Sequence, residues 1–140
     1  MSRVINPDSA GKERTRLSKA IVLAIRELAR QQEVTDHSRD LAAFIVLALQ
    51  VISAGIDVSV AAWEKRDYWV KADRFRMEWA WAGNLGEKLK AALLAEDWGG
   101  VAGVATQIAG KLGKVRVSEK HRMGTPWIGA YRRFLNESGN

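Results

Sequence analysis

Three carboxylates in the middle of the chain have a spacing that would suit metal chemistry. Glu64, Asp67 and Glu78 are 3 and 11 residues apart, which places them on one face if this stretch is helical. A helical metal-dependent hydrolase would use such a group to bind a divalent cation. However, Lys71 and Arg74 lie between them on the same face, and this alternation of sign is typical of a ladder of solvated ion pairs. We therefore predict no metal site, and metal-dependent hydrolysis ranks third among the functional hypotheses.

The other residues that support catalysis in proteins occur here without the partners they need. The chain has no cysteine, which excludes disulfides and thiolate metal sites, and it has no G-x-S-x-G motif. His37 and His121 stand alone, at a predicted helix start and in a predicted loop. Gly110-Lys111 is followed by Leu112, where a phosphate-binding loop requires Ser or Thr. We therefore predict no catalytic residue and no cofactor, and we expect a protein that is not an enzyme.

Positive charge is concentrated near the C-terminus. The chain has a net charge of +6, and residues 111–140 contain 7 Lys and Arg against 2 Asp and Glu. Lys and Arg neutralise phosphates, and aromatic side chains stack on unpaired bases. The candidates for polyanion binding are Lys111, Lys114, Arg116, Lys120, Arg122, Arg132, Arg133, Trp127 and Tyr131. The alternative is a solvated tail that keeps the protein soluble, and no motif for sequence-specific DNA binding accompanies these residues.

The elements that must position these residues are predicted to be helices, over residues 8–33, 36–65, 68–95, 98–115 and 126–136. Asn6, Thr35, Asp97 and Thr125 are the expected N-terminal caps. Residues 41–56 are almost wholly apolar, which predicts a helix buried at the centre of the domain. A membrane span needs about 20 apolar residues, and this stretch is interrupted at Asp57, so we predict no membrane segment.

Apolar residues at spacings of 3 and 4 predict the buried face of the helix over 68–95. They are Tyr68, Ala72, Phe75, Trp79, Ala82, Gly86, Leu89 and Leu93. The apolar face of the preceding helix has a different phase, which predicts a turn near residues 64–68 despite the lack of Gly and Pro. Small residues in the helix over 98–115 predict close approach of another backbone, with a frayed helix as the alternative. They are Gly99, Gly103, Thr106, Gly110 and Gly113.

These patterns together predict an all-α fold in a single domain over residues 1–140. We expect an antiparallel four-helix bundle, followed by a basic loop and a short C-terminal helix. The helix over 68–95 also has a second apolar stripe, made of Trp63, Val70, Met77 and Trp81. A helix with two apolar faces buries both, either inside its own chain or against a partner. These four residues are therefore candidates for a partner interface.

The leading functional hypothesis is a small, basic, non-enzymatic helical module. It would bind nucleic acid or another polyanion through its C-terminal segment, or serve as a subunit of a larger assembly. The first alternative is a homo-oligomeric helical scaffold or protein-interaction module that binds no nucleic acid. The N-terminal residues contain no apolar signal segment, so we expect a cytoplasmic location.

Overall fold

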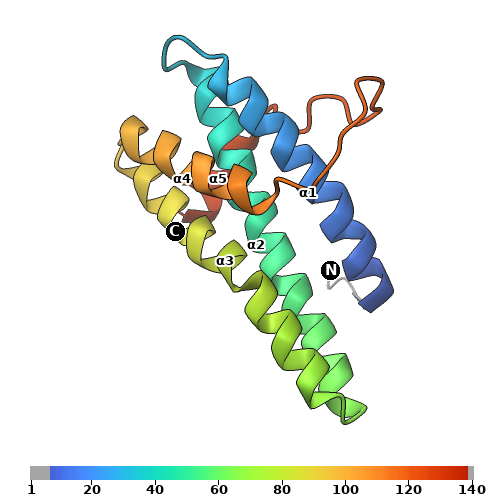
Figure 1. Cartoon of the computed structure of the whole chain (residues 1–140). Coiled ribbons are helices and arrows are strands. Elements are labelled where there is room, and N and C mark those ends of the chain that lie inside the picture. Colours follow the sequence, from blue (N-terminus) through green and yellow to red (C-terminus); the bar gives the residue numbers. More distant parts are fainter. Residues whose placement is uncertain (1–6, 139–140) are drawn as a thin grey trace.

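The computed structural model describes residues 7–138, and this part of the chain is all-helical, with no strand (Figure 1). Turns or loops connect the helices, and the longest connection covers residues 112–129. The helices are α1 (Pro7–Ala29), α2 (Asp36–Lys65), α3 (Trp69–Leu94), α4 (Trp98–Lys111) and α5 (Ala130–Ser138).

The apolar helix α2 is the centre of the fold. It packs against α1, α3 and α5, whereas α4 packs mainly on α3. Leu41, Ile45 and Leu49 of α2 are 0% exposed, as expected for a helix that is apolar on every side. This helix has the length and hydropathy of a membrane span, and 61% of its most apolar stretch is buried inside the fold. Core helices of soluble proteins share these properties, so they alone do not indicate a membrane.

Side-chain caps begin α2 and α4 where the sequence predicts them. The Thr35 hydroxyl accepts the N–H of Ser38, and the Ser38 hydroxyl accepts the N–H of Thr35, so the two residues form a capping box. Asp97 accepts the N–H of Gly100 at 3.0 Å. The cap expected at Asn6 lies outside the described residues.

The turn predicted near residues 64–68 lies there, between the end of α2 at Lys65 and the start of α3 at Trp69. Asp67 adopts the left-handed conformation with φ of 63°, which a short polar side chain tolerates better than most. Glu96 does the same between α3 and α4, with φ of 54°. Both reversals therefore use an acidic residue where Gly is more common.

Three predicted helix boundaries are wrong. α1 ends at Ala29 instead of residue 33, and α4 ends at Lys111 instead of residue 115. In both cases the backbone tightens into i→i−3 hydrogen bonds, from Arg30 after α1 and from Gly113 after α4. α5 begins at Ala130 instead of residue 126, so Thr125 is not its cap. The Asp40 carboxylate of α2 replaces it, accepting the N–H groups of Gly129 at 3.1 Å and Tyr131 at 3.0 Å.

The small-residue stripe of α4 does not receive another backbone within the described chain. Its glycines Gly103 and Gly110 are exposed, and a Cβ built on either would have no neighbour within 4 Å. Close approach occurs elsewhere. A Cβ on Gly86 of α3 would lie 3.3 Å from the Cβ of Leu49, and one on Gly55 of α2 would lie 3.4 Å from that of Ala10. These two glycines allow α3 and α1 to pack tightly on α2.

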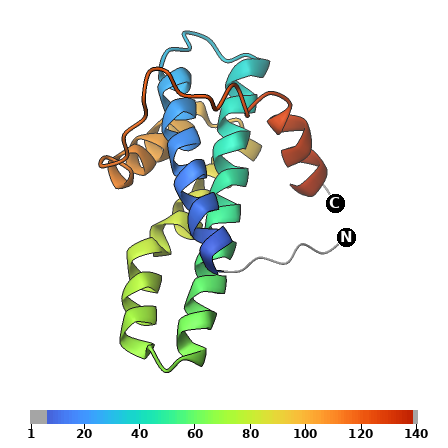
Figure 2. The same cartoon turned by 90° about the vertical axis from the view of Figure 1, so that its right-hand side faces the viewer.

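Residues 112–129 carry the chain from one side of the fold to the other. They cross over α1 and α2, and they place α5 on the side of α2 away from the end of α4 (Figure 2). Leu112 and Trp127 are buried along this path, and Val115 and Met123 pack partly on the core. The segment is therefore pinned at several points.

The hairpin of α2 and α3 extends well beyond the other helices (Figure 2). α1 begins beside Gly55, and its Arg14 reaches Phe75 and Trp79 of α3. Below that level α2 and α3 continue to their turn with no third helix beside them. We call residues 57–78 the arm, and the rest of the described chain the body.

Candidate interaction surface

The arm leaves several large apolar side chains in contact with solvent. Tyr68 and Trp69, at the turn and the start of α3, are 52% and 54% exposed. Val70 and Met77 follow along α3 and are 67% and 77% exposed. Val70 and Met77 are about two helical turns apart, so they share one face. This face is the most apolar exposed surface that the arm presents.

The stripe predicted to face a partner is divided by the structure. Val70 and Met77 are exposed, as that hypothesis requires. The other two residues are partly buried, because Trp63 packs edge-to-face on Phe75 with ring centroids 4.8 Å apart, and Trp81 stacks on Trp79 at 5.6 Å. Trp63 and Trp81 are therefore less accessible to a partner than Val70 and Met77.

The stripe predicted to be buried is fully buried only from Ala82 onward. Leu89 and Leu93 are 0% exposed, and Ala82 and Gly86 are also buried. Closer to the turn, Phe75 and Trp79 are only partly buried, and Tyr68 is exposed. The predicted face of α3 is correct, but the arm lacks the neighbouring helix that would cover it.

Arg14 closes the boundary between the arm and the body. Its guanidinium carbon lies 4.8 Å from the ring centroid of Phe75 and 5.5 Å from that of Trp79, within cation–π range. The Nη1 atom of Arg14 is buried and has no hydrogen-bond partner among the described residues. Burial lowers the pKa of Arg14, and the negative charge of Glu78 opposes this shift. No sequence pattern distinguishes this residue, because Arg on an amphipathic helix normally faces solvent.

The carboxylates that suggested metal binding are separated by the turn. Glu64 is on α2, and its carboxylate accepts a hydrogen bond of 2.9 Å from Arg76 of α3. Arg76 also bonds Asp73 at 2.6 Å, and Asp67 lies in the turn itself. Lys71 sits 4.5 Å above the Trp63 ring. Within residues 7–138 no group of three or more His, Asp or Glu is arranged to hold a metal ion.

The basic side chains of residues 111–122 are all accessible. Lys111, Lys114, Arg116, Lys120 and Arg122 are exposed. Arg116 donates to the carbonyl oxygen of Gly113 at 3.0 Å. No ion pair between described residues involves any of the five. Their charges are therefore free to attract an anion.

The two aromatic candidates for base stacking have other contacts. Trp127 is 5% exposed and packs edge-to-face on Phe44 at 6.4 Å. Its indole is therefore not accessible for stacking on a base, and the interpretation of Trp127 as a stacking platform does not fit this structure. Tyr131 is partly buried and stacks on Phe134 at 6.2 Å. Trp127 and Tyr131 dock α5 on α2.

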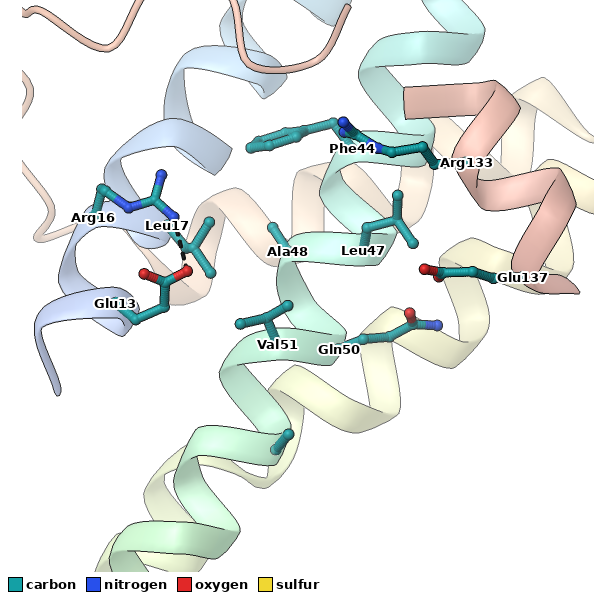
Figure 3. Close-up of a pocket in the computed structure, with 11 residues that line it drawn as sticks. Glu13, Arg16, Leu17, Phe44, Leu47, Ala48, Gln50, Val51, Arg133 and Glu137 are labelled. Atoms are coloured by element: carbon teal, nitrogen blue, oxygen red, sulfur yellow. Dashed lines mark hydrogen bonds and ion pairs between the residues drawn. The ribbon is translucent and has the colours of Figure 1, made fainter. Parts of the chain in front are cut away.

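Arg132 and Arg133 lie on α5, on the other side of α2 from the end of α4 (Figures 1 and 2). Arg133 borders a groove of about 450 Å³ between α1 and α5, whose floor is α2 (Figure 3). The floor is apolar except for Gln50, and each wall carries one acid and one base, Glu13 with Arg16 on α1 and Arg133 with Glu137 on α5. Because each wall carries one positive and one negative charge, the groove has no net charge that would favour an anion.

A polar cluster that the sequence did not predict fixes the α3–α4 turn to α2. Arg39 donates to Glu96 at 3.1 Å, and the indole N–H of Trp98 donates to the same carboxylate at 2.8 Å. These hydrogen bonds, that of Arg39 first, lower the pKa of Glu96. Arg39 and Glu96 are 57 positions apart, so no local pattern predicts the pair.

Compared with known protein families, with curated proteins and with solved structures, the chain matches none of them.

Proposed function

We propose that this protein is a non-enzymatic assembly module that binds another protein surface through its arm. The observation that supports this most strongly is the exposure of Val70 and Met77, 67% and 77%, on a hairpin that no third helix covers. Isolated apolar residues are common on surfaces, but these stand beside exposed Trp69 and Tyr68. Trp, Tyr and Met are enriched at protein interfaces, and this group of exposed side chains has that composition.

The charges around the patch favour a protein partner over a lipid surface. Asp73 and Glu78 are exposed on the same helix as Arg74 and Arg76, so acids and bases alternate around the apolar residues. An anionic membrane would repel the acids, whereas a protein rim accommodates both signs. In this proposal α2 is the core helix of a soluble module, and α1 to α4 form an antiparallel bundle. Successive helices reverse direction at each of the three turns, which supports that arrangement.

Site-specific photo-crosslinking tests this function. A photoreactive amino acid would replace Met77, and a matched one would replace Leu135, an exposed residue of the body on α5. In the cells that produce the full-length chain, we expect the photoreactive residue at position 77 to crosslink the chain to a protein. The yield of crosslinked protein at position 135 should be much lower. Equal labelling at the two positions, or none at 77, contradicts the proposal.

A second candidate function is the binding of a polyanion such as nucleic acid by residues 111–122. Five exposed cations without an ion pair among the described residues favour it. Since Trp127 is buried, this binding would depend on phosphate contacts rather than on base stacking. Fluorescence anisotropy with single-stranded RNA and DNA oligomers at low salt tests it, and failure to bind leaves the segment as a source of solubility.

A further inference from the structure

We infer that the surface that covers the arm is the arm of a second copy of this chain, related by a two-fold axis. The two α3 helices would lie antiparallel, with Val70 of each copy against Met77 of the other and Asp73 of each copy opposite Arg74 of the other. This inference rests on the proposed function of the arm and names its partner.

The exposed face of α3 has the composition that this pairing needs. Val70, Asp73, Arg74 and Met77 recur at spacings of 3, 1 and 3, so they form one stripe of a helix. All four are exposed, and the Asp73 side chain is 63% accessible although Arg76 of the same helix bonds one of its oxygens at 2.6 Å. Arg74 makes no ion pair with any described residue. The stripe is thus apolar at both ends, with adjacent opposite charges at its centre.

Charge complementarity selects the antiparallel orientation and the second copy. When the stripe is reversed on itself about a point between Asp73 and Arg74, each acid meets a base and each apolar residue meets an apolar one. A parallel pair would instead place Arg74 against Arg74 and Asp73 against Asp73, and like charges oppose association. A two-fold contact uses the same patch twice, so a self-complementary stripe is what a symmetric dimer requires.

The pairing would also supply what the arm lacks. Two arms side by side make four antiparallel helices, and each α3 gains the apolar neighbour that is missing below the level of α1. Trp69, which is 54% exposed next to Val70, would lie at the edge of the contact. The body would not take part, which leaves residues 111–122 of both copies accessible.

Sedimentation of the full chain at increasing concentration tests the inference. We expect a reversible equilibrium between monomer and dimer, and we expect Met77→Glu to abolish the dimer while helicity by circular dichroism stays unchanged. The matched variant Leu94→Glu, at an exposed body position of the same helix, should leave the dimer intact. A wild-type chain that stays monomeric over about a hundredfold range of concentration overturns the inference. The crosslink at position 77 would still support the proposed function if it captured a different protein.

Charge exchange tests the register. Asp73→Arg places Arg against Arg74 of the second copy, and Arg74→Asp places Asp against its Asp73, so each single variant should weaken dimerisation by about 3- to 30-fold, as expected for two symmetric exposed pairs. The double variant restores opposite charges and should recover most of the affinity. If the double variant is as weak as the two single effects combined, the two residues do not face each other and the register is wrong.

Cysteine pairing provides an independent test, because the natural chain has no cysteine. Oxidation of a mixture of Val70→Cys and Met77→Cys chains should give mainly the mixed disulfide dimer, since each position faces the other. Val70→Cys alone should cross-link slowly. Preferential formation of the Val70→Cys homodimer would indicate a parallel pair and contradict the antiparallel one.

Discussion

α2 and α3 are packed in two different ways along their length. In the body, Leu49 of α2 and Leu89 and Leu93 of α3 are 0% exposed. In the arm, the only buried residue that α3 contributes is the small Ala72, while larger neighbours such as Met77 remain exposed. Part of the difference lies in the sequence, because 10 of the 22 residues of the arm are charged, compared with 27% of the whole chain. The rest comes from the number of helices that surround each part.

This contrast identifies which apolar surface the chain leaves unused. In the body α1, α4 and α5 surround the hairpin, so the stripes of α2 and α3 close into a core. The arm has one helix pair, and a helix pair can bury only the faces that meet. We therefore interpret the arm as the part of the hairpin that needs a partner to cover its apolar side chains.

Replacing one tryptophan in each region should give the largest difference in the free energy of unfolding. Trp127 of the body is 5% exposed, so Trp127→Ala should lower the free energy of unfolding by about 3–5 kcal/mol. Trp69 of the arm is 54% exposed, so Trp69→Ala should stay within about 0.5 kcal/mol in dilute, monomeric protein. Urea melts measure both. Equal losses would show that the arm is as well packed as the body.

Substitution of a buried and an exposed leucine makes the same comparison within α3. Leu89→Ala should cost about 2–5 kcal/mol, because the side chain is 0% exposed. Leu94→Ala serves as the control, since Leu94 is 50% exposed, and its effect should be small. If urea melts give the two variants the same stability, the assignment of the buried face of α3 is wrong.

Phe75→Ala measures how far the packing of the arm is complete. Phe75 contacts Trp63 and Arg14 but is only partly buried, so its removal should cost less than the about 3–5 kcal/mol of a fully buried Phe. The loss should also grow with protein concentration if dimerisation stabilises the arm. Melts at two concentrations test this, and a full-sized loss independent of concentration contradicts it.

The basic segment should affect binding without affecting stability. If Lys120 and Arg122 contact a single-stranded backbone, replacing both with Gln should flatten the slope of log affinity against log salt by up to about 1.4 units, about 0.7 for each contact. Melting temperature should not change, because both side chains are exposed. The control replaces Lys65 and Lys88, exposed cations outside the segment. An equal change in slope for the control would mean nonspecific attraction by the whole protein.

The smallest expected effect concerns the pH dependence of the body. The hydrogen bond from Arg39 holds the pKa of Glu96 below its ordinary value. A carboxyl with a lowered folded-state pKa stabilises the fold above its unfolded-state pKa, and this contribution is lost as pH falls through the folded-state value. Glu96→Gln should therefore reduce stability at neutral pH and have little effect in strong acid. Urea melts at both pH values check this, and a pH-independent effect contradicts it.

Periodicity was sufficient to predict the helices, because local spacing determines which face of a helix is apolar. It placed the turn between α2 and α3 correctly, and residue type identified the caps Thr35 and Asp97. It failed at the start of α5, where the cap is Asp40 from a distant part of the chain. Contacts between remote residues depend on how helices are arranged, and a single sequence does not specify that arrangement.

The candidate surface was also predictable only in part. The second stripe of α3 was visible from spacing, but spacing alone did not separate Val70 and Met77 from Trp63 and Trp81. That separation depends on where α1 ends and where the aromatic rings find partners. The interpretation of Trp127 as a stacking residue failed for the same reason, since only the fold shows that its ring packs on Phe44.

Hydrogen exchange measured residue by residue in dilute protein tests the central claim, the contrast between arm and body, most directly. Backbone amides of α2 around Leu49 and of α3 around Leu89 lie in the closed core, so they should exchange only through the largest openings. Amides of residues 57–78 should exchange much faster, and their protection should rise with protein concentration while that of the body does not. Equal protection of arm and body at the lowest concentration would contradict the account, because the arm would then be complete without a partner.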